Sequence, residues 1–401
     1  MELKSKLNPF APRERFLVLE ISPKGAKGLF LNVDENRRIV FEKSVDRLDL
    51  ENFLASPFQN LLQKSWEGQR LFKFRRKIIV AADPSVATTI PVPLEIPRDR
   101  GQWDEEITIA ELENLIAQAM QKVFNACRTD AATRLGVDDI HAILVGAKTK
   151  RFTIDGRSVM NPVGFAGRKI SLLLELTFTG RALFDELKQF FSAPEAFFFV
   201  EAPQVRLASL SRVRKLPVNL VVADGDGAAL FVLRNGKGAA AAKDTYPVLH
   251  RGALAWSFGS IFNAISAELG VSERTAEGLY CSYIAGEMSE SARRTFKKIF
   301  QPALDDFLKE IADAHVEGTV YVDAPHELPF ALPHRHGAVV FERIPVPELL
   351  EQFGFAGGLP DFPKDARVAS APLLYFLEAY FDKSNSEINQ KLRRRLHWLA
   401  E

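Results

Sequence analysis

The stretch FTIDGRSVMNPVGFAGRKI, residues Phe152–Ile170, has the most specific pattern in the 401-residue chain. Three of its glycines, Gly156, Gly164 and Gly167, can supply the positive φ angles that tight turns require. Pro162 fixes φ between the first and the second of them. The stretch therefore predicts an ordered loop made of successive turns.

The segments around this loop are predicted to form a small unit of helix and strands. Thr108–Cys127 has apolar residues at helical spacing, and Thr108 with Glu111 forms a capping-box pattern at its start. Three strands are predicted nearby, at Asp139–Gly146, Lys150–Ile154 and Lys169–Phe178.

Two other parts of the chain begin with the same order of strand, tight turn and strand. The first has strands at Phe16–Ile21 and Lys27–Asn32 around a turn at Pro23–Gly25. The second has strands at Asn219–Ala223 and Ala229–Leu233 around a turn at Asp224–Gly227. The order of elements thus repeats although the sequence does not.

Further along the second part, Asn235-Gly236 predicts a hairpin turn, because both residues of such a turn need positive φ. A long helical stretch follows from Leu254 to Ile311, with breaks predicted near Gly270 and Gly286.

Composition excludes several classes of protein. Lys and Arg number 52 against 51 Asp and Glu, so no overall basic field for nucleic acid exists. No apolar run approaches the ~20 residues of a spanning helix. The two cysteines, Cys127 and Cys281, are predicted to be buried thiols in a reducing compartment. No metal site is expected, because acidic ligands do not accompany His334 and His336 at ligand spacing.

The loop Phe152–Ile170 closely resembles a stretch of the bacterial cell-division protein FtsA family. There an aromatic residue precedes Ile-Asp-Gly, followed by Asn or Asp with Pro, a Gly, and a second Gly before a basic residue. Weaker similarity covers nearly the whole chain in the family's order, at Phe199–Leu210, Leu216–Leu233, Leu269–Glu277 and Ala371–Tyr380. The PilM family of the actin-like superfamily is similar as well.

The resemblance implies an α/β, actin-like (ribonuclease-H-like) fold of two lobes, with an inserted α+β SHS2-type domain and a C-terminal amphipathic helix. The implied boundaries are residues 1–82, 182–215 and 345–385 for lobe 1, 83–181 for the inserted domain, 216–344 for lobe 2 with its helical subdomain at 250–312, and 386–401 for the terminal helix.

Actin-like ATPases hold phosphates with two hairpin turns, usually Asp-x-Gly, in which Asp orders Mg²⁺ and Gly admits backbone N–H groups. The resemblance places Glu20-Ile21-Ser22-Pro23-Lys24 at the first turn. Glu20 stands in place of Asp and Ser22 in place of Gly, while Lys24 or Lys27 could still contact a phosphate.

The second turn leaves two alignments open. Without a gap, Val222 stands where the family has Asp, and Asp224 and Asp226 stand where it has Gly. A shift of two positions makes Asp224 the turn carboxylate, with Gly225, Asp226 and Gly227 completing the turn. The two aspartates either bind Mg²⁺ or only form the turn, as Asp-Gly pairs commonly do.

The adenosine end also differs from the family. Asp323 and Ala324 stand where the family has glycines, and they lack the backbone freedom for close approach to a nucleoside. Glu277 matches the helical subdomain that contacts nucleotide, whereas Tyr280 replaces a nearby Lys. Binding of ATP and Mg²⁺ is therefore expected to be weak or lost, and ATPase activity very weak or absent.

The C-terminal segment SEINQKLRRRLHWLAE, residues 386–401, has the composition of an interfacial amphipathic helix. Its expected membrane-contacting residues are Ile388, Lys391, Leu392, Arg393, Arg394, Arg395, Leu396, Trp398 and Leu399. The alternative is a terminal helix that packs on its own domain with solvated arginines.

The resulting hypothesis is a cytoplasmic scaffold at the inner face of the cell membrane that self-associates in cell division. Its expected partners are an FtsZ-like filament and an anionic membrane surface, with no nucleic acid. One alternative is a PilM-like component of a type IV pilus or secretion assembly, bound to an inner-membrane protein. The other is an active ATPase of the same fold.

Overall fold

The computed structural model describes residues 14–22, 25–33, 39–48, 77–190, 197–225, 227–236, 246–346 and 348–349. The chain divides into two compact units. One comprises Met1–Ser209 with Pro347–Glu401, and the other comprises Leu210–Val346. The predicted lobe boundaries stay predictions.

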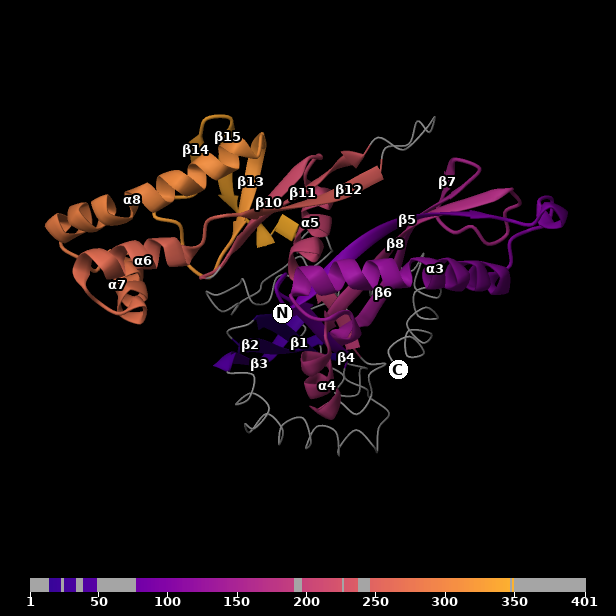
Figure 1. Ribbon diagram of the computed structural model, residues 1–401, viewed down its shortest axis with the longest axis horizontal. Coiled ribbons are helices and arrows are strands. Elements are labelled where there is room, and N and C mark those ends of the chain that lie inside the picture. Colours follow the sequence, from indigo (N-terminus) through magenta and orange to yellow (C-terminus); the bar gives the residue numbers. More distant parts are fainter. Residues whose placement is uncertain are drawn as a thin grey trace, which may run out of the picture. The chain divides into compact units, whose positions relative to one another are not determined.

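The first unit contains a five-stranded sheet of order β3-β2-β1-β4-β9, of which Figure 1 labels the first four strands. Its strands are β1 (Glu14–Ser22), β2 (Gly25–Val33), β3 (Ile39–Leu48), β4 (Lys77–Ala82) and β9 (Phe197–Glu201). The first three pair antiparallel, while β4 runs parallel to both β1 and β9. Leu19, Val80 and Ala81 are fully buried, as continuous apolar runs in parallel strands predict.

The second unit contains a six-stranded sheet of order β12-β11-β10-β13-β15-β14. Its strands are β10 (Val218–Ala223), β11 (Ala228–Gly236), β12 (Tyr246–Leu254), β13 (Gly318–Asp323), β14 (His334–His336) and β15 (Val339–Arg343). As in the first sheet, three strands, β10, β11 and β12, pair antiparallel. Strand β13 runs parallel to both β10 and β15.

The two main sheets therefore share one topology: strands one to three form an antiparallel meander, and two parallel strands extend it beyond strand one. The architectural repeat predicted from the sequence is confirmed at this level. The repeat, with helices beside strands in both units, gives the chain the α/β, actin-like fold that was expected.

Helices α6 (Phe258–Leu269), α7 (Glu273–Ala285) and α8 (Glu290–Asp313) lie together beside the second sheet (Figure 1). Gly270 and Gly286 end the first two in the left-handed conformation, as the predicted breaks require. Leu254 is not helical, because it ends β12. Phe258, Tyr280, Phe300, Phe307 and Phe341 are fully buried in the shared core.

A separate four-stranded sheet of order β5-β8-β6-β7 belongs to the first unit. Its strands are β5 (Ala87–Pro97), β6 (Ala142–Ile154), β7 (Arg157–Val159) and β8 (Lys169–Gly180), all antiparallel to their neighbours. Helix α3 (Ile109–Leu135) packs on this sheet through Leu112, Ile116 and Met120. We call β5–β8 with α3 the antiparallel module.

Shorter elements connect these parts. They are the 3-10 helices η1 (Arg100–Gln102) and η2 (Asp139–His141), and the helices α4 (Arg181–Phe190) and α5 (Ala202–Val213).

Two strand-and-turn predictions were wrong. Asp139–Gly146 and Lys150–Ile154 are not separate strands, because β6 runs continuously from Ala142 after a 3-10 turn. Asn235-Gly236 does not form the hairpin turn, because Asn235 pairs with Pro247 and Gly236 with Tyr246 in the β11–β12 ladder. Pairing of β11 thus extends past the residues that best suit a turn.

The C-terminal segment 386–401 lies outside the described residues, as do Lys24 and Asp226. Among the helices that the structure describes, none combines the length and the apolar character that crossing a membrane requires.

Candidate functional site

The loop between β6 and β8 begins with a two-residue hairpin. Asp155 has φ 47° and Gly156 has φ 82°, and Ile154 pairs with Arg157 across them. Positive φ at both central residues is the signature of the turn whose twist matches a β-hairpin. Asp at the first position tolerates this conformation better than most residues.

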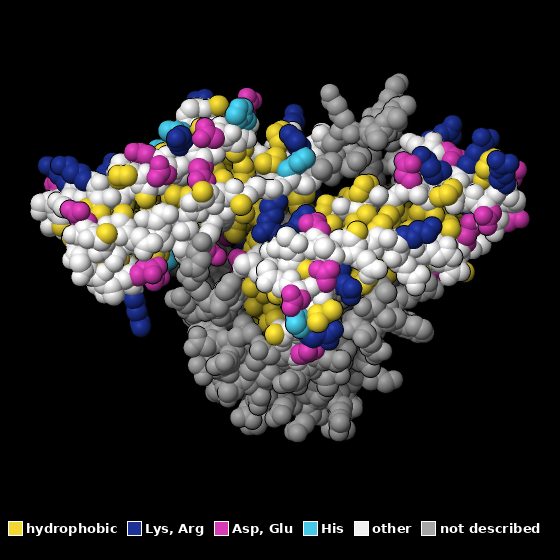
Figure 2. Space-filling view, in the orientation of Figure 1, with side chains coloured by type: hydrophobic (Ala, Val, Ile, Leu, Met, Phe, Trp, Pro, Cys, Tyr) yellow, Lys and Arg dark blue, Asp and Glu magenta, His cyan; other side chains and the backbone are white. Residues whose placement is uncertain are grey.

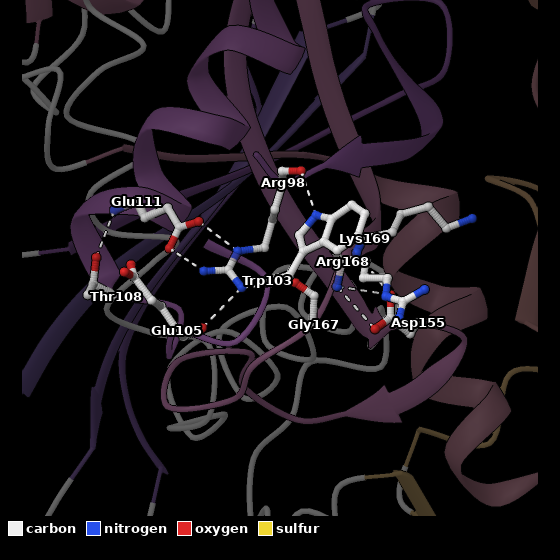
Figure 3. Close-up of polar contacts among 9 residues, drawn as sticks. All are labelled: Arg98, Trp103, Glu105, Thr108, Glu111, Asp155, Gly167, Arg168 and Lys169. Atoms are coloured by element: carbon white, nitrogen blue, oxygen red, sulfur yellow. Dashed lines mark hydrogen bonds and ion pairs between the residues drawn. The ribbon is translucent and has the colours of Figure 1, made fainter. Parts of the chain in front are cut away.

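The Asp155 carboxylate also closes the far end of the loop. It accepts hydrogen bonds from the backbone N–H of Arg168, at 3.1 and 3.2 Å, and of Lys169, at 2.9 Å (Figure 3). The Asp155 side chain therefore joins the start of the loop to its end, at residues thirteen and fourteen positions further along the chain.

A buried arginine holds the loop from the other side. The Arg98 guanidinium donates to both carboxylate oxygens of Glu111, at 2.7 and 3.0 Å. It also donates to the backbone carbonyls of Glu105, at 3.1 Å, and Gly167, at 2.9 Å (Figure 3). Charge-assisted bonds of this kind are about twice as strong as neutral ones.

Thr108 caps α3 as predicted, since its hydroxyl accepts from the N–H of Glu111 at 3.2 Å. The reciprocal half of the predicted capping box is absent from the described contacts. The Glu111 carboxylate binds Arg98 instead, because a charged guanidinium is a stronger donor than a backbone amide.

Trp103 adds a further layer beside Arg98. Its indole N–H donates to the Arg98 carbonyl at 3.1 Å, and the Arg168 guanidinium carbon lies 5.0 Å from the centre of its ring. Backbone bonds between Ile107 and the loop, at 2.8 Å to Phe165 and 3.0 Å from Gly164, complete the support. The loop is thus held from three sides.

The loop glycines have two different roles. Gly156 and Gly164 have φ of 82° and 86°, as predicted. Gly167 does not have positive φ. A Cβ on Gly167 would lie 2.2 Å from Cγ2 of Ile154, so this position needs glycine for space.

The loop carries two large apolar side chains into solvent. Met160 is 76% exposed and Phe165 is 51% exposed. Apolar side chains that stay exposed on a loop held by hydrogen bonds are available for contact with a protein partner. We call Asp155–Lys169 with these two side chains the presenting loop.

The first predicted phosphate turn has an internal partner. The Glu20 carboxylate accepts a hydrogen bond from Arg206 of α5 at 2.8 Å, and the Arg206 side chain is almost fully buried. Ser22, at the end of β1, pairs with Gly25 across a two-residue connection. Arg206 thus places a buried positive charge beside this carboxylate.

The second predicted phosphate turn is also closed by its own contacts. The Asp224 carboxylate accepts from the N–H of Gly227 at 2.8 Å, which is the turn-forming role. Val222 lies inside β10, so the turn starts at Asp224 and β11 follows it regularly. The N–H groups of Phe258 and Gly259 donate to the carbonyls of Asp224 and Gly225, each at 2.9 Å.

This packing leaves little room at the start of α6. A Cβ on Gly259 would meet the Gly225 carbonyl oxygen at 2.4 Å. The first amides of α6 would otherwise be an anion site, and here they bind turn carbonyls.

Of the residues predicted for the adenosine end, Glu277 lies beside a histidine. Glu277 of α7 lies 3.4 Å from Nε2 of His326, which follows β13. The His326 ring packs against Phe258, Phe262 and Tyr280, with centroid distances of 5.3, 5.2 and 6.3 Å. Asp323 is buried at the end of β13 beside Val222.

Tyr280, at the position where the family has a Lys, is fully buried. Its hydroxyl donates to the Glu327 carbonyl at 2.7 Å, and burial raises the pKa of the phenol far above its usual value. The aromatic ring and its hydrogen bond fix the loop that carries His326.

Arg98, Arg206 and His326 were not predicted as site residues. Arg98 stands in a charged run that reads as solvated, and no local pattern distinguishes Arg206 or His326. The prediction of two buried cysteines was correct for Cys127 and wrong for Cys281, which is exposed on α7. Within the described ranges, no three His, Cys, Asp or Glu side chains are grouped to hold a metal ion.

No protein-family model and no curated protein matches the chain. Among solved structures, the PilM-PilN type IV pilus biogenesis complex matches at 13% identity and TM-score 0.43, over 95% of this chain and 99% of that one. The cytoplasmic domain of EpsL, an inner-membrane component of the Vibrio cholerae type II secretion system, matches at 11% identity and TM-score 0.30, over 86% and 97%.

The ethanolamine utilization protein EutJ from Carboxydothermus hydrogenoformans matches at 9% identity and TM-score 0.29, over 78% of this chain and 77% of that one. These likenesses are remote and carry no function over to this chain.

Proposed function

We propose that this protein is a scaffold of the actin-like fold that works by binding through its presenting loop and not by turnover of ATP. The observation that carries the proposal is the pair of contacts from Arg98 to Glu111 and to the Gly167 carbonyl, which we call the Arg98 clamp. The clamp holds the loop in one conformation while Met160 and Phe165 stay exposed. A loop held in one conformation loses little entropy on binding, so its apolar contacts contribute more to affinity.

The predicted nucleotide residues support the same proposal. Glu20 binds Arg206, Asp224 binds its own turn, and Glu277 binds His326. A nucleotide would have to break or rearrange these contacts, at the cost of leaving charged or polar groups without partners. We therefore propose that Mg²⁺ and ATP bind weakly or not at all.

The occupant that we propose for the presenting loop is a second copy of this chain, in line with the self-association of the family that the sequence resembles. Sedimentation velocity of the wild type against Met160→Ser with Phe165→Ser tests this. Ile140→Ser is the matched control, because Ile140 lies in η2 of the same unit and is 66% exposed.

Attachment to the cytoplasmic face of a membrane by residues 386–401 is a separate part of the proposal. It rests on the apolar stripe and the arginine cluster of that segment. Co-sedimentation with anionic liposomes, with and without residues Lys391–Glu401, tests it. Loss of pelleting in the shortened chain would support the anchor, and equal pelleting would contradict it.

Two finer forms of the scaffold proposal differ in the partner that the scaffold binds besides a second copy of itself. In one, the scaffold links an FtsZ-like filament to the membrane during division. In the other, it binds an inner-membrane protein of a pilus or secretion assembly. Titration of the labelled protein with an FtsZ filament and, separately, with the cytoplasmic segment of such a membrane protein distinguishes them.

On the face seen in Figure 2, basic and acidic side chains are interspersed over the described surface. A nucleic-acid partner would be served by a continuous basic field, which this face does not present. This agrees with a protein or membrane partner.

A further inference from the structure

Three reactive side chains of the second unit lie in one row. Glu277 and Cys281 stand one turn apart on α7, and His326 lies between them on the segment that follows β13. Cys281 Sγ lies 3.8 Å from His326 Nδ1, and His326 Nε2 lies 3.4 Å from Glu277 Oε1. The two ring nitrogens thus face a thiol on one side and a carboxylate on the other.

Surrounding aromatic rings fix the imidazole in this position. Phe258 and Phe262 contact it with centroid distances of 5.3 and 5.2 Å, and Tyr280 lies at 6.3 Å. Only about a sixth of the His326 side chain is exposed, at 16%. A fixed ring keeps both distances short, which a surface histidine on a free loop would not do.

Glu277 selects the tautomer of His326. The negative charge of the Glu277 carboxylate, 3.4 Å from Nε2, favours the tautomer that carries its proton on that nitrogen, and Nδ1 is then the acceptor atom of the ring. Nδ1 then faces the Cys281 thiol. A nucleophile, a base and a group that orients the base are the three parts that activate a weak nucleophile in proteins.

The thiol needs such help. Partial burial, and then the nearby Glu277 carboxylate, raise the pKa of Cys281 above its ordinary value, which disfavours the free thiolate. Among the residues that the structure describes, the titratable groups facing the thiol are Glu277 and Tyr280 on its own helix and His326 on the segment after β13. Of these, the imidazole is suited to accept the proton near neutral pH.

We propose that Cys281 is a modification site, a nucleophilic thiol that His326 and Glu277 activate toward small disulfides. In the step, the S–H proton passes to His326 Nδ1 while the Cys281 sulfur attacks one sulfur of the disulfide. The S–S bond of the disulfide breaks, a new S–S bond to Cys281 forms, and the departing thiolate takes up the proton. The small disulfide is the oxidant, and a small thiol reverses the step.

Disulfide exchange fits this position better than acyl transfer does. Cys281 lies inside α7, where backbone N–H groups are engaged in the helix, so they cannot stabilise an oxyanion. Exchange develops charge only on sulfur and needs no such donors. An adduct at Cys281 would lie beside His326 and would disturb the packing of its ring against α6 and α7.

The chain provides its own internal control, because Cys127 is its other cysteine and is buried in the antiparallel module. The experiment follows the reaction of the full chain with the neutral disulfide dithiodipyridine by absorbance, from about pH 5 to pH 9. We expect one rapid phase in the native protein that is lost in Cys281→Ser. Its rate should begin to rise at a lower pH than the one at which the Cys281 thiol would ionise without a base.

Two variants separate activation from mere proximity. His326→Phe keeps the aromatic packing and should slow the rapid phase about ten-fold or more, with the rate rising only at the higher pKa of the thiol. Glu277→Gln should change the reaction rate in opposite directions, depending on whether the carboxylate acts through His326 or directly on the thiol. If the carboxylate acts through His326, the reaction slows; if it is only a negative neighbour of the thiol, its loss lowers the thiol pKa and the reaction accelerates.

A His326→Phe protein that reacts as fast as the wild type, or an accelerated Glu277→Gln protein, overturns the proposal. Circular dichroism and thermal unfolding check that each variant folds. If His326→Phe fails that check, the sign of the Glu277→Gln effect decides alone, because this side chain is 35% exposed and tolerates the change. Equal, slow reaction of both cysteines would also refute the proposal.

Discussion

Arg98 binds Glu111 through two hydrogen bonds, of 2.7 and 3.0 Å, and the same guanidinium reaches the Gly167 carbonyl 69 positions further along the chain. The start of α3 and the end of the presenting loop are therefore joined by one buried cation. The stability of the loop and that of the helix start should change together when this side chain is altered.

Arg98→Met should destabilise the protein by about 3–5 kcal/mol, because it leaves the Glu111 carboxylate and two carbonyls without their donor. Urea unfolding followed by circular dichroism measures this. Arg100→Met is the control, since Arg100 is exposed on η1 and should cost less than about 0.5 kcal/mol. Equal effects of the two variants would show that Arg98 is not a clamp.

Gly167→Ala should destabilise the loop by about 1–3 kcal/mol, because the added Cβ meets Cγ2 of Ile154 at 2.2 Å. Gly101→Ala is the matched control, since a Cβ there has nothing within 4 Å. Thermal unfolding of both variants checks the prediction. A Gly167→Ala protein as stable as the control would mean that the loop accommodates the methyl group.

Tyr280 should make stability fall at alkaline pH. Its folded pKa is raised by burial, so above the ordinary phenol pKa of about 10 the unfolded chain loses this proton and the folded chain keeps it. The free energy of unfolding then decreases as pH rises past that value. Tyr280→Phe should remove this part of the slope, although it costs about 1 kcal/mol at neutral pH through the lost bond to Glu327.

Urea unfolding of the wild type and of Tyr280→Phe at several alkaline pH values isolates the contribution of this phenol. The difference between their free energies of unfolding should shrink as pH rises. A difference that stays constant would contradict the assignment.

Titration calorimetry with Mg²⁺ and ATP at millimolar concentration should give no saturable heat, because Glu20, Asp224 and Glu277 already have partners. Asp224→Asn should behave like the wild type in this assay. Saturable binding in the wild type that Asp224→Asn abolishes would instead make the second turn a working phosphate site.

Much of the fold could be predicted because local pattern and fold agree in the main sheets. The strands predicted at Phe16–Ile21 and Lys27–Asn32 and the strand–turn–strand unit around Asp224–Gly227 appear as expected. Caps such as Thr108 and the breaks at Gly270 and Gly286 depend on neighbouring residues only, so sequence is sufficient for them.

The site could be predicted less well, because its contacts join residues far apart in the chain. Nothing local to Arg98 indicates that it is buried, since its partner Glu111 lies in α3 and its partner Gly167 lies in the presenting loop. Asn235-Gly236 shows the opposite error, where strong local turn propensity is overridden by pairing with β12. Nothing local to His326 indicates its surroundings either, because its ring contacts Phe258 of α6 and Tyr280 of α7.

Self-association through the presenting loop is measured by sedimentation velocity of the native protein and of Met160→Ser with Phe165→Ser. We expect the wild type and Ile140→Ser to sediment faster as protein concentration rises, while the double variant sediments as a monomer with unchanged circular dichroism. A wild type that stays monomeric throughout, or a double variant that associates as the wild type does, would contradict it.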